Sequence, residues 1–354
     1  MALANPLLGD APGRRYAAKP ERFLPLVTLY LSERCNSRCV TCDYWRHGTR
    51  DMTLAAVRRL LPDLAALRTR AVLLSGGEPL VNPEWRAIAE LLKSHGLTLW
   101  LLTSGLSLAK HASAASELFD SVTVSLDGTC AETYAAIRGL DAFDKVCDGI
   151  RALAASGRRA SLRVTLQRSN YRELPRFVTL ARELGAGGVS FLAVDVSNAH
   201  AFARRDDSSP ELALGDEDIV ELERLLGRLE CEHAEDFRTG FIAEPPAKLR
   251  RVRDYFAALR GRGEFPPVRC NAPEFSAVVE SDGRVAPCFF IPGPRLGPRA
   301  PDLRAALASE PMRALRAAAR DGRRPECERC VCSKWRDAAA LERETFTSEA
   351  AAHA

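Results

Sequence analysis

Short apolar runs alternate with longer segments of helical periodicity through the N-terminal half of the chain. Each run has the length and composition of a buried strand, whereas the segments between runs repeat their apolar residues at the spacing of an amphipathic helix. Glycines at positions 96, 157 and 185 mark the ends of three of these helical segments. The predicted strands are residues 26–31, 71–75, 97–103, 121–126, 161–167 and 189–194.

The alternation of strands and helices predicts an α/β fold, with a parallel sheet and helices outside it. Thr53 is the predicted N-cap of the first helix. Six strands with their helices are fewer than the eight units of a closed barrel. The predicted helices are residues 53–67, 83–95, a polar segment that ends near residue 118, 142–156 and 174–184.

The remainder of the chain is organised differently. Residues 195–215 form a long polar loop that is equally consistent with a lid and with a linker, and amphipathic helices are predicted at 216–230 and 246–260. Cysteines return from about residue 265 onward, which indicates a second module. The predicted parts are a flexible segment at 1–24, a core at 25–262, a small cysteine-containing domain at 263–337 and a frayed helical tail at 338–354.

Composition narrows the class of protein. The 354 residues are 46% hydrophobic, and the formal net charge of +4 comes from interspersed charges, a balance that favours neither a nucleic-acid partner nor a membrane. The chain shows no signal peptide and no apolar run of about 18 residues. Eleven cysteines in two main groups favour metal binding over disulfides, and we expect a reducing cytoplasm.

The loop after the first predicted strand carries Cys35, Cys39 and Cys42. Thiolates are the usual ligands of iron–sulfur clusters, which normally take four. Three thiolates from one loop would leave one iron of a cubane open to a small molecule. Structural cysteines and a zinc site are the alternatives, although zinc ligand pairs usually have a different spacing.

This CxxxCxxC run after a first strand resembles the signature of the radical S-adenosylmethionine (SAM) superfamily. The resemblance implies a partial (β/α)6 TIM-like barrel, in agreement with the strand count. It also implies a [4Fe–4S] cluster whose open iron binds SAM and whose electron releases a 5′-deoxyadenosyl radical. Many family members carry an aromatic residue before the third cysteine, where this chain has Thr41. The alternatives are that Tyr44 or Trp45 compensates and that the pocket is more open.

The run Gly76-Gly77-Glu78 directly follows the second strand. Two glycines let the backbone approach a ligand closely and expose its amide groups, and parallel sheets place their sites at this end of the strands. An ordinary strand-to-loop turn is the alternative. The run matches the family's GGE motif, and the resemblance implies that it receives the amino group of SAM.

Further candidate SAM-binding residues follow the later strands. Ser104 follows the third strand, Ser125 ends the fourth, and Arg138 follows a short helix. The resemblance implies that Ser125 and Arg138 hold the SAM carboxylate, which a guanidinium binds through paired hydrogen bonds. It also implies that Val194, after the sixth strand, lines the adenine. A helix-capping serine, a surface arginine and a core valine are the alternatives.

A second group of cysteines follows the pattern C-x17-C-x38-C-x2-C and consists of Cys270, Cys288, Cys327 and Cys330. Four thiolates suffice for one closed tetrahedral centre. Cysteine spacing does not distinguish an iron–sulfur cluster from structural zinc. Cys332 is a fifth thiol, which is an alternative ligand, a thiol near the substrate or a simple neighbour.

A β-hairpin is predicted between the first two of these cysteines, with strands at 275–280 and 284–287 around Asp282 and Gly283. The hairpin pair and the close pair of cysteines together resemble the short "twitch" form of the SPASM extension. That resemblance implies one auxiliary [4Fe–4S] cluster, whereas a full SPASM domain holds two. The predicted C-terminal part is therefore a small β-hairpin and helix domain that holds an auxiliary iron–sulfur cluster.

The resemblance predicts an enzyme that takes a hydrogen atom from its substrate in a dehydrogenation, decarboxylation or related oxidation. A flavodoxin- or ferredoxin-type protein is the expected reductant. Family members that act on ribosomal peptides often carry a peptide-recognition domain before the barrel. Because only about 24 residues precede the first strand here, we expect a small-molecule substrate. The alternatives are radical modification of a ribosomally synthesised peptide and a non-catalytic iron–sulfur or zinc protein.

Two further sets of residues complete the predictions. The candidate substrate contacts, each equally well explained as surface or pocket wall, are Tyr44, Arg46, Arg168, Asp195 and His200. The isolated cysteines, to which no role is assigned, are Cys130, Cys147 and Cys231.

Overall fold

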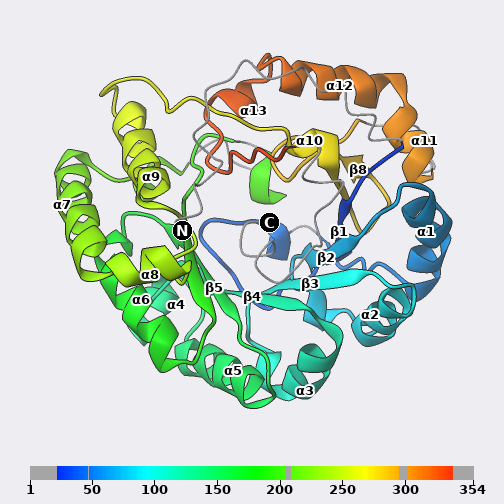
Figure 1. Ribbon diagram of the computed structural model, residues 1–354, viewed down its shortest axis with the longest axis horizontal. Helices are drawn as coiled ribbons and strands as arrows, with labels where there is room; N and C mark the ends of the chain where they lie inside the picture. Colours follow the sequence, from blue (N-terminus) through cyan, green and yellow to red (C-terminus); the bar gives the residue numbers. More distant parts are fainter. Residues whose placement is uncertain (1–21, 47, 199, 204–208, 295–301, 338–354) are drawn as a thin grey trace, which may run out of the picture.

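A computed structural model describes residues 22–46, 48–198, 200–203, 209–294 and 302–337. Its centre is one sheet of eight strands in the order β6-β5-β4-β3-β2-β1-β7-β8. The first six strands pair in parallel and curve into a partial barrel (Figure 1), which confirms the predicted fold class. These strands are β1 Leu26–Ser32, β2 Ala71–Gly76, β3 Thr98–Thr103, β4 Ser121–Ser125, β5 Ser161–Leu166 and β6 Gly188–Ala193.

Helices follow these strands along the chain and cover the outside of the barrel (Figure 1). Thr53 caps the first of them as predicted, because its side chain accepts a hydrogen bond from the Ala56 amide at 3.1 Å. The short α4 ends in the left-handed Gly139, φ 72°. The helices are α1 Leu54–Ala66, α2 Trp85–Ser94, α3 Leu108–Leu118, α4 Ala131–Arg138, α5 Phe143–Ala155 and α6 Leu174–Glu183.

The two faces of the strands have different environments. On β5, Leu162 and Val164 lie in the main apolar core against the outer helices, while Arg163 between them lies on the opposite face. A second, smaller apolar cluster fills part of the barrel interior beneath β1, β2 and β3, with Leu26 and Trp100 among its members. The interior face of β4, β5 and β6 is more polar, which leaves chemically active groups on that side of the barrel.

Beyond the barrel strands the chain continues with α7 Asp216–Glu232, α8 Ala234–Thr239 and α9 Pro246–Leu259. The sequence predicted α7 and α9 but not α8. The predicted loop 195–215 contains short 3-10 turns at Ala201–Ala203 and Pro210–Leu212, and residues 199 and 204–208 of it lie outside the described part. The predicted segments 1–21 and 338–354 also lie outside it.

The predicted hairpin is present and belongs to the barrel sheet. Its strands are β7 Ser276–Val279 and β8 Val285–Ala286, paired antiparallel around Gly283 in the left-handed region, φ 86°. Strand β7 also pairs in parallel with β1, so the sheet continues across the predicted domain boundary at residue 262. The sequence did not predict this pairing, because the two strands are far apart in the chain.

Short helices surround the hairpin in the C-terminal part. They are α10 Ala272–Phe275, α11 Leu303–Ala308, α12 Glu310–Arg320 and α13 Pro325–Glu328. The last three lie across the gap between α9 and β1 and complete the ring (Figure 1). In the part of the chain that the structure describes, no helix combines the length and apolar character needed to cross a membrane.

Candidate metal centres and cofactor site

The first cysteine loop leaves β1 with its thiols close enough to influence one another. Burial, with a contribution from the neighbouring Cys39, raises the pKa of Cys35 to about 11 and that of Cys42 to about 12. The Cys35 sulfur accepts a hydrogen bond from the Ser37 amide at 3.4 Å. Cys35 and Cys42 therefore stay protonated unless a cation replaces their protons, and a bound metal supplies that positive charge.

Backbone hydrogen bonds hold this loop on two sides. The Gly77 amide donates to the Ser32 carbonyl at 2.8 Å, and the Glu78 amide donates to the Arg34 carbonyl at 2.9 Å. Contrary to the expectation from sequence, these two amides therefore bind the cysteine loop itself and do not face a ligand. A Cβ atom at Gly77 would lie 2.4 Å from the Arg34 carbonyl oxygen, which explains the glycine by close packing.

The end of α4 holds the other side of the loop. The Arg38 amide donates to the Arg138 carbonyl at 3.0 Å, and the Val40 amide donates to the Ile137 carbonyl at 3.0 Å. A Cβ atom at Gly139 would lie 2.3 Å from the Arg38 carbonyl oxygen, and φ there is +72°. Amides of the cysteine loop thus satisfy carbonyl groups at the end of α4 that have no partner within the helix.

Glu78 is fully buried and joins the ends of β2 and β3. Its carboxylate accepts hydrogen bonds from the Thr103 hydroxyl at 2.8 Å and from the Ser104 amide at 2.6 Å. The Ser104 hydroxyl in turn donates to the Asn36 side chain in the cysteine loop at 3.0 Å. Burial raises the pKa of Glu78 above its usual value despite these donors.

Arg138 lies beside the first cysteine group. Its Nη1 is 3.2 Å from the Cys39 sulfur and 3.4 Å from Oδ2 of Asp127, and its Nη2 donates to the Ser125 carbonyl at 2.8 Å. Burial alone would lower the pKa of Arg138, but the Cys39 thiolate and the Asp127 carboxylate outweigh it and raise that pKa. A charged guanidinium is therefore fixed beside the thiols.

Asp127 is a neighbour of Arg138 that was not among the residues predicted for the site. Asp127 is 2% exposed, and its Oδ1 accepts the Thr165 amide at 2.7 Å while its other oxygen faces Arg138. Its position two residues after Ser125, at the end of β4, was the available signal. The candidate adenine neighbour Val194 is buried directly after β6, with its amide bonded to the Leu166 carbonyl at 2.9 Å.

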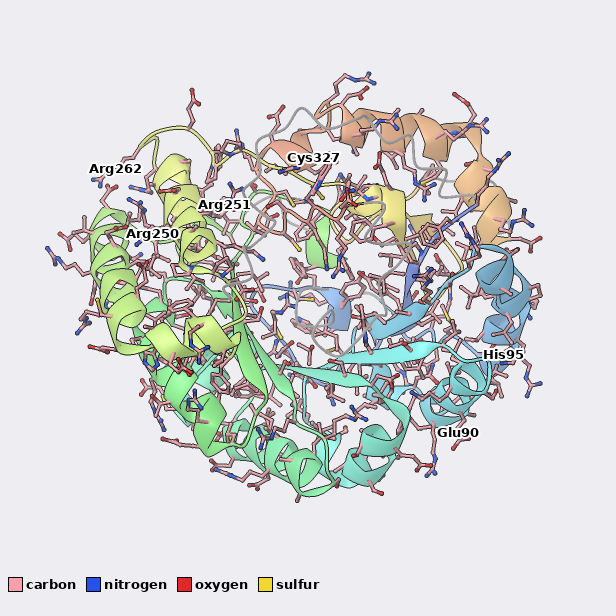
Figure 2. All side chains as sticks on the ribbon, viewed as in Figure 1. Glu90, His95, Arg250, Arg251, Arg262 and Cys327 are labelled. Carbon is pink, nitrogen blue, oxygen red and sulfur yellow. The ribbon has the colours of Figure 1, made fainter. Side chains whose placement is uncertain are left out.

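The second cysteine group draws its thiols together from three segments. Burial raises the pKa of Cys288 to about 12 and that of Cys327 to about 11, and a Cys270 thiolate raises both. Burial also raises the pKa of Cys330, and among the other thiols Cys332 contributes most to that rise. These mutual influences place all five C-terminal thiols near one another, with Cys327 in α13 (Figure 2).

The candidate substrate contacts separate into different surroundings. Arg168 is 62% exposed and pairs with Asp218 of α7 at 3.3 Å, away from the cysteine loop. Asp195 is buried, and its carboxylate accepts the Ser197 and Asn198 amides at 2.9 and 3.0 Å, so it shapes its own turn. The His200 amide likewise bonds within this turn, to the Asn198 side chain at 2.8 Å.

Aromatic residues lie between the two cysteine groups. The ring of Tyr44, two residues after Cys42, meets Tyr30 edge-on with centroids 5.6 Å apart. Tyr30 packs against Phe289, next to Cys288, at 6.3 Å.

The side chains of Trp45 and Arg46 contact each other. The guanidinium of Arg46 covers the Trp45 ring at 4.5 Å, and Arg46 also pairs with Asp43 at 3.4 Å. The ring of Trp45 is thus already in contact with neighbours in the same loop.

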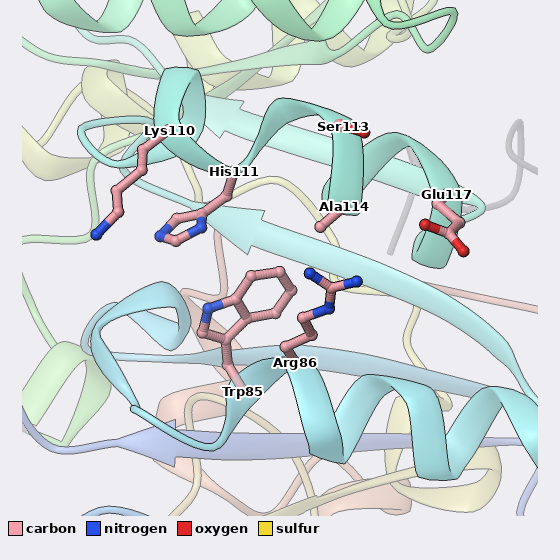
Figure 3. A pocket seen from close by; sticks show the side chains of 7 residues that line it. All are labelled: Trp85, Arg86, Lys110, His111, Ser113, Ala114 and Glu117. Atoms are coloured by element: carbon pink, nitrogen blue, oxygen red, sulfur yellow. The ribbon is translucent and has the colours of Figure 1, made fainter.

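A surface pocket of about 330 Å³ lies between α2 and α3 (Figure 3). Trp85 and Arg86 line one wall, and Lys110 and His111 line the other, with the His111 ring edge-on to Trp85 at 5.2 Å between centroids. None of the predicted site residues lines it. Among the described residues, no group of three or more His, Cys, Asp or Glu side chains is arranged to hold a single metal ion.

Comparison with known proteins decides the family. Residues 29–181 match the family model of the radical SAM superfamily, and residues 270–331 match that of SPASM, an iron–sulfur cluster-binding domain. The GTP 3′,8-cyclase of Pseudomonas fluorescens is 30% identical over 239 residues, which are 64% of this chain and 70% of the cyclase. The chain belongs to the radical SAM superfamily. Its C-terminal part is a SPASM iron–sulfur domain.

Other matches to this radical SAM protein are partial. The pre-heme d1 synthase of Dinoroseobacter shibae is 32% identical over 168 residues, 46% of this chain and 41% of the synthase. The chain spans less than half the length of several curated relatives that it matches. The structure of anSMEcpe with bound AdoMet and the Cp18Cys peptide superposes with a TM-score of 0.59 at 20% identity, covering 82% of each chain, and shows the shared fold.

Proposed function

We propose that this radical SAM protein cleaves SAM reductively and uses the resulting 5′-deoxyadenosyl radical to take a hydrogen atom from a small-molecule substrate. The observation that carries the proposal is the set of Cys35, Cys39 and Cys42, three mutually close thiols with a charged Arg138 beside them. These residues fit a [4Fe–4S] cluster, which supplies the electron for the cleavage when bound. Three thiolates leave one iron for SAM.

The chain's own residues bind and orient the sulfonium. Arg138 receives the SAM carboxylate, because its charge and forked donors suit that group and because Asp127 and the Ser125 carbonyl fix its direction. The segment Gly76-Gly77-Glu78 receives the amino group. Since its Gly77 and Glu78 amides are already bonded to the cysteine loop, the groups left for an ammonium are acceptors. The remaining proposed cofactor contacts are Ser104, Ser125 and Val194.

The C-terminal thiols Cys270, Cys288, Cys327 and Cys330 hold one auxiliary [4Fe–4S] cluster. Their crowding and their raised pKa values match the requirements of a bound metal cluster, as in the first site. Cys332 is a neighbour of this group and not one of its four ligands. These thiols would hold a cluster able to take up one electron, chemistry that would suit a net oxidation of the substrate. A flavodoxin- or ferredoxin-type protein delivers the initial electron.

The names of relatives support a small-molecule substrate, since GTP 3′,8-cyclase and pre-heme d1 synthase are named for small molecules. The structure of anSMEcpe was determined with a peptide, which makes a peptide the second candidate substrate. The test of the core proposal does not depend on this choice, because radical SAM proteins can cleave SAM without a substrate.

The deciding experiment is anaerobic reconstitution with iron and sulfide, followed by incubation with SAM and dithionite. We expect roughly eight irons per chain, the content of two cubanes, and formation of 5′-deoxyadenosine measured by mass spectrometry. Protein without acid-labile sulfide, or SAM that remains intact under strong reductant, would contradict the proposal. Zinc in place of iron at the second site would reject the auxiliary cluster alone.

A further inference from the structure

Two segments of the C-terminal part, residues 264–271 and 329–336, lie against each other beside the auxiliary cysteines. The Asn271 amide donates to the Lys334 carbonyl at 2.8 Å. The Asn271 side chain donates to the Arg336 carbonyl at 2.8 Å and accepts the Arg336 amide at 2.9 Å. One asparagine therefore fastens the two segments together, and we call the surface that they form the auxiliary face.

Trp335 is the most exposed aromatic side chain of the auxiliary face. Among the described residues only four large hydrophobic side chains are exposed, and Trp335, at 44%, is the only tryptophan of the four. The guanidinium of Arg269, the residue before Cys270, lies over the Trp335 ring at 4.6 Å from its centroid. Tryptophan and arginine are among the residue types most enriched at the centres of protein interfaces.

A second pair of the same kind joins the two segments in the opposite sense. The guanidinium of Arg329, the residue before Cys330, lies over the Phe265 ring at 4.9 Å from its centroid. Phe265 packs in turn on Tyr255 of α9, with ring centroids 5.9 Å apart. Both arginines of the auxiliary face are exposed, and neither forms an ion pair with another of the described residues.

Other arginines of the C-terminal half have carboxylate partners. Arg250 and Arg262 near the outer rim pair with Glu230 and Asp216 of α7 (Figure 2). Charge along the chain also favours the auxiliary face. Together with their flanks, at 260–270 and 323–337, its segments contain eight Arg or Lys and four Asp or Glu, an excess that equals the net charge of +4 of the whole chain. The auxiliary face therefore suits an acidic partner.

We propose that the auxiliary face docks an acidic flavodoxin-type electron carrier, a small protein that presents the edge of a flavin ring among carboxylates. The inference rests on the proposed function, because it gives an electron carrier a binding place on this chain. The Trp335 ring offers a flat apolar surface to the flavin edge, and Arg269 and Arg329 complement the carboxylates around it. A ferredoxin-type carrier offers the charge but no such ring.

The location suits electron exchange. Because Arg269 and Arg329 directly precede Cys270 and Cys330, a carrier bound to them lies next to proposed ligands of the auxiliary cluster. A net oxidation of the substrate leaves one electron in the protein in each turnover. The oxidised carrier would take up that electron and be reduced, with no transfer of atoms. A contact of a few side chains also fits the small interfaces through which electron carriers bind.

The test measures binding without turnover. Anaerobically reconstituted protein is titrated by calorimetry with a purified acidic flavodoxin in its oxidised form and, separately, with an acidic ferredoxin, at about 50 mM and about 300 mM salt. The variants are Trp335→Ala and Arg269→Glu. Their controls are Val220→Ala and Arg228→Glu, which change an exposed apolar residue and an exposed arginine on the outer helix α7. Two variants from separate segments keep the test valid if one of them fails to fold, which its iron content would show.

We expect the wild type and both controls to bind the flavodoxin with a Kd on the order of 10 μM at the lower salt concentration, and more weakly at the higher one. Trp335→Ala and Arg269→Glu should each bind it about tenfold more weakly, because each removes a side chain from the centre of the interface. Three results would overturn the proposal: no binding below about 100 μM, wild-type affinity in either folded variant, or tighter binding of the ferredoxin than of the flavodoxin.

The proposed function has its own readout in the same preparations. Cleavage of SAM by the wild type with dithionite depends on the first cysteine group and needs no protein carrier. If 5′-deoxyadenosine fails to form while the flavodoxin binds as expected, the radical mechanism falls and the docking surface stands. The reverse result rejects only the docking surface.

Discussion

The two cysteine groups are assembled in different ways. The first three cysteines share one loop, which backbone hydrogen bonds fasten to the Gly76-Gly77-Glu78 segment and to the end of α4. The second group comes from three segments, and its local elements α10, β8 and α13 are only 4, 2 and 4 residues long. The loop of the first group is therefore held by the barrel itself, whereas we expect the arrangement of the second group to depend more strongly on a bound metal.

The largest expected effect is loss of the first cluster. Cys39→Ala should abolish 5′-deoxyadenosine formation and remove about four irons per chain, because the remaining two thiolates cannot hold a cubane. Since the barrel shapes this loop, the melting temperature should change little. The control Cys231→Ala removes an exposed thiol on α7 and should behave as wild type in both assays. Full SAM cleavage by Cys39→Ala would refute the assignment.

The matching change in the second group should cause the same loss of iron but should not affect SAM cleavage. Cys327→Ala should also remove about four irons per chain but leave substrate-independent SAM cleavage intact. Because the short elements around it lack a core of their own, we expect faster limited proteolysis after residue 262. Unchanged iron content, or a C-terminal part that resists proteolysis as the wild type does, would remove the contrast between the two sites.

The close backbone contact at the first loop predicts a steric effect. Gly139→Ala would place a methyl group 2.3 Å from the Arg38 carbonyl at φ +72° and should destabilise the protein by about 2 kcal/mol, with lower iron content. Gly227→Ala is the control, because a Cβ atom at Gly227 in helix α7 would meet open space: beyond the local helix backbone, no atom of the described residues lies within 4 Å of it. That control should stabilise the helix by about 1 kcal/mol. Chemical denaturation measures both, and equal effects would disprove the contact.

A smaller effect is expected where a charge orients the cofactor ligand. Asp127→Asn should weaken SAM binding about tenfold, because Arg138 keeps its bond to the Ser125 carbonyl but loses its buried counter-charge. Equilibrium dialysis of reconstituted protein measures the affinity. Asp148→Asn, in an exposed ion pair with Arg151, is the control and should bind SAM as the wild type does. Unaltered affinity in Asp127→Asn would show that the pair is not needed for orientation.

The last expected effect is a pH dependence of stability that arises from Glu78, whose pKa is raised by burial at the first site. A carboxyl whose pKa is raised in the folded state destabilises the fold once it is charged. Its contribution to the free energy of unfolding therefore falls as the pH rises from about 4.3 through the raised pKa. The glutamine of Glu78→Gln does not titrate, and this variant should be less stable than wild type by about 1–3 kcal/mol near pH 4. The reason is that the glutamine NH₂ group is a donor and would face the Thr103 hydroxyl or the Ser104 amide, which are donors too.

This deficit of Glu78→Gln should shrink toward pH 7. Denaturation curves at several pH values measure it, with Glu90→Gln on the outer surface of α2 as the matched control (Figure 2). A deficit that grows with pH would show that the charged form of Glu78 is the stabilising one.

Much of the fold was predictable because each barrel element is specified locally. Apolar runs defined the strands, and Thr53 and Gly96 marked helix ends that the structure confirms. Strand β7 could not be assigned to β1, because a parallel pairing between distant segments leaves no local signal. Helix α12 was missed for a related reason: its residues are mostly Ala and Arg, and few of them are buried.

The candidate site was predictable in residue type but not in contacts. Cysteine spacing indicated both groups, and the structure brings each group together. The sequence could not show that Gly77 and Gly139 accommodate backbone carbonyls, since a glycine has the same letter whether it meets a ligand or the chain itself. Asp127 was overlooked because its partner Arg138 becomes its neighbour only after folding.

The shared sheet between β1 and β7 has a practical consequence for dissecting this protein. Cutting the chain before residue 263 would strip β1 of its neighbour and present a row of unpaired amides and carbonyls to solvent. An exposed strand edge of this kind pairs with strands of other molecules. An isolated barrel should therefore aggregate during expression. Each metal centre is best studied by point substitution within the intact chain.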